Sequence, residues 1–274
     1  MVNSDIIKKI REIEIKSEIV VQDIFAGDYK SVFKGNGIEF DEIREYSEGD
    51  EIRDIDWNVT ARQNKPFVKK YREERELNVV LMIDISGSSN FGSVKAKSAE
   101  LCATLAIAAA KNRDRVGAIF FSDKIEKVIP IKNGKKHALS IIENFLTIDS
   151  NGKGTDLGNA LGFFEKTFKK RSVLFIISDF LCSNYEKVLK RISLKHDVIL
   201  INIVERAQEE IPKGAIFLFE DMESGEVFEV DTSSRSLKVE NRLIPNHKNL
   251  IKIYSDEDFL KQLKLFFRRR KRLS

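Results

Sequence analysis

The chain is poor in the residues that build disulfide-linked or disordered proteins. It has two cysteines and four prolines among 274 residues, and it contains no low-complexity tract. Cys102 and Cys182 each lie in an apolar stretch without any secretory context, which favours two buried free thiols over a disulfide. The scarcity of proline argues against long disorder. With 42% hydrophobic residues, the chain can instead bury a substantial core.

Long hydrophobic runs are missing too. No segment approaches the roughly 18 consecutive apolar residues that typify a membrane helix. The N-terminus carries charges scattered along its first 15 residues and has no apolar core of the signal-peptide type. We therefore expect no membrane span and a cytoplasmic location.

The chain also lacks an excess of charge of one sign. Its 47 basic and 43 acidic residues leave a net charge of +4. Five consecutive basic residues, 268–272, account for more than this excess, which argues against a basic face that binds nucleic acid. We expect no nucleic-acid partner. The basic run suits the C-terminal end of a helix, and contact with an acidic surface or nucleic acid is the alternative.

Apolar runs rich in valine and isoleucine alternate with helical patterns from residue 78 onward. Runs at 78–84, 172–180 and 197–205 each end in a polar loop, as strands covered on both faces do. This order predicts an α/β, Rossmann-like fold with a mostly parallel central sheet flanked by helices. Further strands are expected at 115–123 and 124–132, weaker strand signals cover 215–253, and helices are expected at 94–112, 135–148, 156–170, 184–195 and 256–272.

Residues 1–75 have a different composition. After a short amphipathic start, the segment is charged and rich in turn residues, with no series of helices or strands long enough for an independent core. We expect an N-terminal extension of short strands and turns packed on a main domain of residues 76–274. Charged residues surround the only tryptophan, Trp57, and extend to Arg62. These charges either pin the extension in place or form a surface that recognises a partner.

Carboxylate and hydroxyl side chains occur where three loops are expected to meet. Asp84, Ser86 and Ser88 follow the first buried strand, Asp179 ends the second, and Thr155 comes just before a helix. Because ligands bind beyond the carboxyl ends of parallel strands, we expect these side chains to converge. Taken singly, each is also explained as a turn or capping residue. Together they are the hard oxygen ligands that Mg²⁺ prefers, with Mn²⁺ or Ca²⁺ as alternatives.

The motifs DISGS, GTD and ISD at these positions resemble the metal-ion-dependent adhesion site of von Willebrand factor type A domains. The resemblance implies that the same five residues hold a divalent cation. It also implies that the sixth position of the cation is left for an Asp or Glu of a partner protein. Gly87 and Asp156, which adjoin these residues, are then candidate partner contacts, as are Trp57 and Arg62 upstream.

The segment before the first buried strand resembles one particular family of proteins. The run G-D-x-x-R-x-I-D-W-x-x-x-A-R at 49–62, followed by E-E-R-E, is similar to the hallmark of the bacterial family known as domain of unknown function 58. The likeness covers roughly residues 20–272. It implies a partner, a MoxR-type AAA+ ATPase, and a chaperone-like or assembly role. The stretch 234–250 departs from the family pattern, because it is short, polar and interrupted by Pro245.

An enzyme of a familiar type would need a base, a nucleophile or a phosphate cradle. The three histidines have no visible relation to the polar loops, and neither glycine-containing turn matches a dinucleotide or phosphate-binding motif. We therefore expect a non-enzymatic module that binds a protein partner through a cation. The alternative is a Mg²⁺-dependent phosphoryl-transfer or hydrolase enzyme that uses Asp84.

Overall fold

The computed structural model divides the chain into two compact units, which are considered separately. One unit comprises residues 1–33 and 78–274, and the other comprises residues 34–77. The structure describes residues 4–25, 39–63, 65–72, 76–87, 93–148, 154–205, 210–211, 216–220, 227–231, 237–238 and 247–271.

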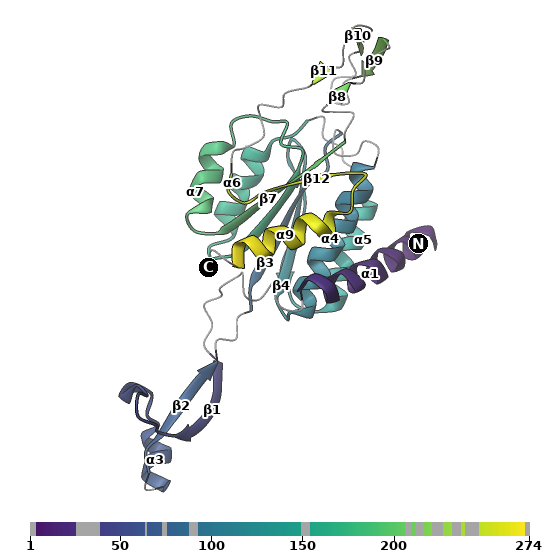
Figure 1. The fold of residues 1–274 in the computed structure, drawn as a ribbon. Helices are drawn as coiled ribbons and strands as arrows, with labels where there is room; N and C mark the ends of the chain where they lie inside the picture. The colour runs from purple at the N-terminus through teal and green to yellow at the C-terminus, as the bar shows by residue number, and fades with distance from the viewer. Residues whose placement is uncertain are drawn as a thin grey trace. The chain divides into compact units, whose positions relative to one another are not determined.

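A six-stranded sheet forms the centre of the larger unit. Its strand order is β12-β7-β6-β3-β4-β5, and every neighbouring pair is parallel except β4 with β5. The strands are β3 (Asn78–Asp84), β4 (Arg115–Phe121), β5 (Ile125–Lys132), β6 (Val173–Ser178), β7 (Asp197–Val204) and β12 (Leu250–Tyr254). Helices cover both faces of this sheet, so the predicted α/β fold with a mostly parallel sheet is confirmed (Figure 1).

The two faces of the sheet carry different helices (Figure 1). Helices α6 (Leu157–Thr167) and α7 (Glu186–Ser193) cover one face. Helices α4 (Val94–Lys111), α5 (Lys135–Thr147) and α9 (Phe259–Lys271) cover the other. Each of these helices lies within a range predicted from apolar periodicity.

The core on the α6 and α7 face fixes the carboxyl ends of the strands. Side chains of Met82, Ile176 and Leu200, from three adjacent strands, are fully buried against Leu161 and Phe164 of α6. Each such side chain stabilises the fold by about 1.5–3 kcal/mol relative to leaving it exposed. The loops that follow β3 and β6 therefore start from well-anchored positions.

The N-terminal helix α1 (Ser4–Phe25) belongs to the larger unit and is longer than the short amphipathic start predicted from the sequence. Ile13, Ser17 and Val21, spaced one turn apart, are buried, and α1 packs on α4 and α5. Thr104 of α4 donates a hydrogen bond to Ser17 (3.2 Å), and Lys135 of α5 pairs with acidic residues of α1. The segment predicted as one extension, residues 1–75, thus contributes to both units.

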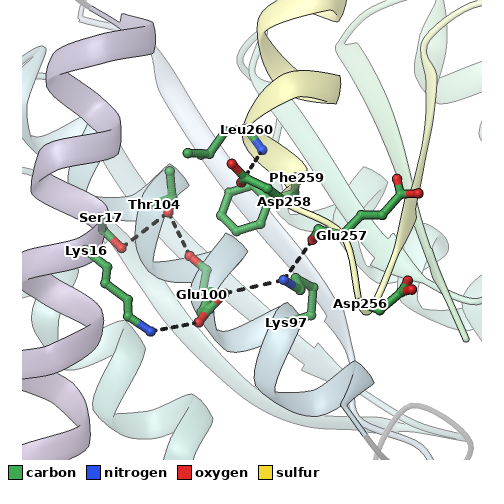
Figure 2. Close-up of a pocket in the computed structure, with 10 residues that line it drawn as sticks. All are labelled: Lys16, Ser17, Lys97, Glu100, Thr104, Asp256, Glu257, Asp258, Phe259 and Leu260. Carbon is green, nitrogen blue, oxygen red and sulfur yellow. Dashed lines mark hydrogen bonds and ion pairs between the residues drawn. The ribbon is translucent and has the colours of Figure 1, made fainter.

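A pocket of about 440 Å³ lies between α1, α4 and residues 256–260 at the start of α9 (Figure 2). Lys97 of α4 is one of the residues that line it: its Nζ donates to the main-chain oxygen of Glu257 (2.9 Å) and lies 5.7 Å from the centre of the Phe259 ring. None of the polar loop residues singled out in the sequence lines this pocket. The contacts of Lys97 show that α4, the helix after the Asp84 loop, is tied to α9.

The smaller unit is built on an antiparallel pair, β1 (Glu39–Glu45) and β2 (Phe67–Arg72). A 3₁₀ turn, η1 (Ile52–Asp54), and a short helix, α3 (Trp57–Gln63), lie between them in the chain. Asp56 fixes the start of α3, because its Oδ1 accepts from the main-chain N–H of Asn58 (2.9 Å) and Val59 (3.2 Å). The predicted short strands and turns are confirmed for this segment.

Two small strand pairs occupy the range in which weak strand signals were predicted. Strand β8 (Glu210–Ile211) pairs with β11 (Leu237–Lys238), and β9 (Ile216–Glu220) pairs with β10 (Val227–Asp231). Most of the atypical stretch 234–250 lies outside the described residues. Of the helices that the structure describes, none is long and apolar enough to cross a membrane.

Candidate metal centre

Asp84 ends strand β3 and is buried, with 3% of its surface exposed. Its Oδ1 accepts a hydrogen bond from the main-chain N–H of Ser86 (2.9 Å). Its Oδ2 accepts from the hydroxyl of Ser178 (2.7 Å), at the end of the adjacent strand β6. The N–H of Ile85 donates to the carbonyl oxygen of Phe121 on β4 (2.9 Å), which continues the pairing of β3 with β4 just beyond Asp84. The carboxylate of Asp84 is thus held at the carboxyl edge of the sheet.

Asp179, the next residue after β6, is the second buried carboxylate. Its Oδ1 accepts from the N–H of Leu181 (3.0 Å). Its Oδ2 is buried and has no hydrogen-bond partner among the residues that the structure describes. A buried carboxylate oxygen without a donor is unfavourable, which makes this atom a candidate ligand for a cation.

The backbone after Asp179 is strained. Phe180 has a φ of 58°, in the left-handed region that bulky residues rarely adopt, while its ring is fully buried. The N–H of Phe180 donates to the hydroxyl oxygen of Ser178 (3.0 Å). Ser178 therefore anchors the strained turn and Asp84 with one hydroxyl group.

Burial and repulsion act together on Asp84. The pKa of Asp84 is raised to about 6, first by burial and then by the nearby carboxylate of Asp179, while hydrogen bonds from Ser178 and Ser86 partly oppose the rise. Two carboxylates in a dry environment repel one another. A divalent cation between them would remove this repulsion, because it would neutralise both charges.

The third loop joins the same edge through α6. Asp156 caps α6, because its Oδ1 accepts from the N–H of Asn159 (2.8 Å). Its own N–H donates to the carbonyl oxygen of Ser122 after β4 (2.8 Å). The pKa of the neighbouring Cys182 thiol is raised to about 12, mainly by burial and to a smaller extent by the carboxylates of Asp84, Asp179 and Asp156, one from each of the three loops.

The predicted ligands that can be placed gather at this edge. Asp84, Ser86 and Asp179 lie together, and the side chain of the fully buried Ser86 also hydrogen-bonds to Asp84. Thr155 is half-buried beside Asp156 in the adjoining loop. Ser88 lies outside the described residues.

The predicted partner contacts are more dispersed. Gly87 is half-buried in the Asp84 loop, and Asp156 is exposed next to Thr155. Trp57 and Arg62 belong to the smaller unit, where the indole of Trp57 is 66% exposed and Arg62 is also exposed. Trp57 is therefore not the buried centre of a charge network within its own unit. The described charge pairs there involve Arg44 with Asp50 and Lys69 with Asp56 among others.

Two features of the edge differ from the sequence interpretation or were missed by it. Both cysteines are free, as expected, but Cys182 is only half-buried and adjoins the carboxylates. Ser178 was not identified as a site residue. Its only sequence signal is a serine before the aspartate at a strand end, and its contact with Asp84 depends on the pairing of β3 with β6.

Replacing Ser178 by alanine is expected to destabilise the protein by about 1–3 kcal/mol, because Asp84 loses a donor and the N–H of Phe180 loses its acceptor. Urea denaturation measures this loss. Ser140→Ala is a matched control, since the Ser140 hydroxyl bonds to a carbonyl within its own helix (2.8 Å). Equal losses of stability in the two variants would show that the Ser178 hydroxyl contributes no more than an ordinary hydroxyl that bonds within its own helix.

Comparison with known sequences gives relatives that match over most of this chain. Rv1480, an uncharacterised protein of Mycobacterium tuberculosis, is 28% identical over 235 residues, which cover 82% of this chain and 74% of the relative. Mb1516, an uncharacterised protein of Mycobacterium bovis, gives the same values.

Several solved structures are similar to this chain. BatB of Bacteroides thetaiotaomicron has 16% identity and a TM-score of 0.46, over 72% of this chain and 100% of its own. An aerotolerance-related membrane protein of Bacteroides fragilis has 16% identity and a TM-score of 0.48 over the same shares. Proximal thread matrix protein 1 of the mussel byssus, solved with zinc in its adhesion-site motif, has 18% identity and a TM-score of 0.36, over 47% of this chain and 38% of its own.

A family model decides the classification. The model of the family described as Protein of unknown function DUF58 matches residues 42–244, which is more than half of the chain. The matched range includes α3 of the smaller unit and the three loops at the carboxyl edge of the sheet. The chain therefore belongs to the DUF58 family.

Proposed function

We propose that this chain is a non-enzymatic interaction module that holds a divalent cation at the carboxyl edge of its sheet and binds an acidic residue of a partner protein through it. The observation that carries the proposal is the pair of buried carboxylates, Asp84 and Asp179, one of which has an oxygen without a donor. Asp84, Ser86 and Asp179 would hold the cation. Ser88 and Thr155 join them by the resemblance to adhesion sites.

The donor set suits a hard cation. Carboxylate and hydroxyl oxygens are the ligands of Mg²⁺ and Mn²⁺, and Mg²⁺ needs only one or two protein carboxylates because it keeps several waters. Within the described ranges, no three residues of the His, Cys, Asp and Glu types gather as a metal cluster. This fits a site completed by hydroxyls and by an outside carboxylate. The bound cation would supply an open coordination position for that carboxylate.

The geometry of Asp84 supports binding rather than covalent chemistry. Its carboxylate is 3% exposed and both oxygens already accept hydrogen bonds. A nucleophile or phosphoryl acceptor must itself touch its substrate, whereas a buried carboxylate can act through a cation that it holds. The interaction module is therefore the better-supported function, and the Mg²⁺-dependent enzyme is retained as an outcome of the test.

For the partner, we propose a MoxR-type AAA+ ATPase and a chaperone-like or assembly role. The support is membership of the DUF58 family together with the resemblance on which the expectation was based. The chemistry of the edge adds one requirement, which is an exposed Asp or Glu on the ATPase.

Calorimetric titration with Mn²⁺ and Mg²⁺ tests the cation site. We expect one site per chain and a loss of at least about 100-fold in affinity in Asp179→Ala, because even changes outside the ligand shell commonly weaken metal binding 10–100-fold. Glu186→Ala, an exposed acid at the start of α7, is the matched control and should bind as the wild type does. A wild-type chain that binds neither cation contradicts the proposal.

A second arm tests the partner. Purified MoxR-type ATPase from the same genome should bind the chain in Mg²⁺ and be released by a chelator, and Asp179→Ala should not bind it. Binding that persists in the chelator would contradict the cation-mediated mode. Mg²⁺-dependent hydrolysis of a phosphate ester that is lost in Asp84→Ala would instead support the enzymatic alternative.

A further inference from the structure

The carboxyl edge of the sheet carries a polar row across four adjacent strands. Ile83 of β3 pairs with Ile177 of β6, so that Asp84 and Ser178 lie side by side in the next row. Ser178 pairs in parallel register with Asn202 of β7. Asn202 pairs in turn with a residue of β12, Lys252.

The preceding residues on the same face of these four strands are apolar, in contrast to this polar row. Two residues earlier on each strand, the corresponding positions are Met82, Ile176, Leu200 and Leu250, which belong to or pack against the core under α6 and α7. Side chains two residues apart on a strand point to the same face. Asn202 is therefore a polar side chain in a position that packing alone would fill with an aliphatic one.

Asn202 is completely buried, with 0% of its surface exposed. Neither its Oδ1 nor its Nδ2 has a hydrogen-bond partner in the described part of the chain. An unpaired buried amide is unfavourable by about 1–3 kcal/mol. A side chain that destabilises the fold in this way, next to a candidate ligand cluster, calls for a functional explanation.

Ser178 connects Asn202 to the metal centre. Paired positions on adjacent strands are about 4.8 Å apart, so Asn202 is the direct neighbour of Ser178 on the same face of the sheet. The Ser178 hydroxyl has a single proton, which it donates to Oδ2 of Asp84, and its oxygen accepts from the N–H of Phe180. The orientation of Ser178 thus affects both the Asp84 carboxylate and the turn that carries Asp179.

We propose that Asn202 is a positioning residue of the metal centre that acts on Asp84 through Ser178. A cation at Asp84 would draw on the carboxylate lone pairs that now accept from the Ser178 hydroxyl. The Asn202 carbonyl then offers this hydroxyl another acceptor, and its NH₂ group can donate to the hydroxyl oxygen. Ser178 remains hydrogen-bonded, and the loop with Asp179 keeps its place. This inference rests on the proposed cation site.

Asn202→Leu tests the role, because leucine has a similar size and no hydrogen-bonding groups. We expect about 10-fold weaker Mn²⁺ binding by calorimetry, within the range typical for residues that support metal ligands. In a chelator, urea denaturation should show a stability equal to or above that of the wild type. Asn202→Ser, a smaller change, serves if the leucine variant does not fold, and should also weaken Mn²⁺ binding.

Asn249→Ala is the matched control, since the Asn249 amide donates to the carbonyl oxygen of Val198 near the other end of β7 (2.9 Å). It should lower stability and leave Mn²⁺ affinity unchanged. Wild-type affinity in folded Asn202→Leu would overturn the positioning role while leaving the cation site intact. A flat Mn²⁺ titration of the wild type would overturn both proposals together.

Discussion

Asp84→Asn is expected to stabilise the metal-free protein at neutral pH and to abolish cation binding. The asparagine removes a buried charge and its repulsion with Asp179, the two causes that raise the pKa of Asp84. The amide oxygen still accepts from the N–H of Ser86, and the Ser178 hydroxyl can rotate to accept from the new NH₂ group. The cation, however, loses a negatively charged ligand.

The pH dependence follows from the direction of the pKa shift. The folded state raises the pKa of Asp84 from 3.8 to about 6, so it binds the Asp84 proton more tightly than the unfolded chain does. The stability associated with the neutral carboxyl is fully present below pH 3.8 and is lost as the pH rises through about 6. Asp84→Asn should therefore gain about 1–3 kcal/mol over the wild type at pH 7.5, and little at pH 4.

Urea denaturation in a chelator at the two pH values measures this gain. Asp123→Asn, which changes an exposed carboxylate on the turn between β4 and β5, is the control and should show no such pH-dependent gain. With Mn²⁺ at about 100 times its dissociation constant, the wild type should gain about 2.7 kcal/mol and Asp84→Asn nothing. A variant that is less stable than the wild type at pH 7.5 in the chelator, or that responds to Mn²⁺, would refute this account.

Arg270→Ala is expected to destabilise the protein by about 2–4 kcal/mol. Its Nη2 lies 2.7 Å from Oδ2 of Asp197 at the start of β7, and the two side chains are only 18% and 16% exposed. The guanidinium also lies 5.6 Å from the centre of the Phe266 ring. Without Arg270, the Asp197 carboxylate remains half-buried and loses this counter-ion.

Arg268→Ala is the matched control, because Arg268 lies two residues earlier in the same basic run and is exposed. It should change the free energy of unfolding by less than about 1 kcal/mol, as exposed charges usually do. Equal losses of unfolding free energy in the two variants would show that the ion pair with Asp197 contributes no more to stability than an exposed arginine does. The ion pair also changes the interpretation of the basic run at 268–272. Arg270, at least, is not simply a solvated charge at the end of a helix, because it binds α9 to a residue of the sheet.

Local sequence patterns were sufficient to predict the central sheet and the helices α4 to α7 and α9 that flank it. The apolar runs at 78–84, 172–180 and 197–205 predicted buried parallel strands, which β3, β6 and β7 confirm. The polar residues at their ends predicted an oxygen-rich edge, because the carboxyl ends of parallel strands share one side of the sheet.

Other features depended on contacts that no local pattern contains. The amphipathic start of the chain did not show that α1 would extend to Phe25 and pack on α4 and α5. The boundary expected at residue 75 did not anticipate that residues 34–77 form a unit of their own. The position of α1 depends on the apolar surface that α4 and α5 present once they have packed on the sheet, and the division into two units likewise depends on contacts between distant segments.

The sequence by itself determined the fold class, the DUF58 membership and which carboxylates face a common edge. Only the tertiary structure decided that Ser178, which is 94 positions from Asp84, donates to its carboxylate, and that Asn202 lies in the same row. Strand order and register decide such contacts. These depend on the joint packing of all six strands and their helices, whereas the periodicity of one segment specifies only its own conformation and its buried face.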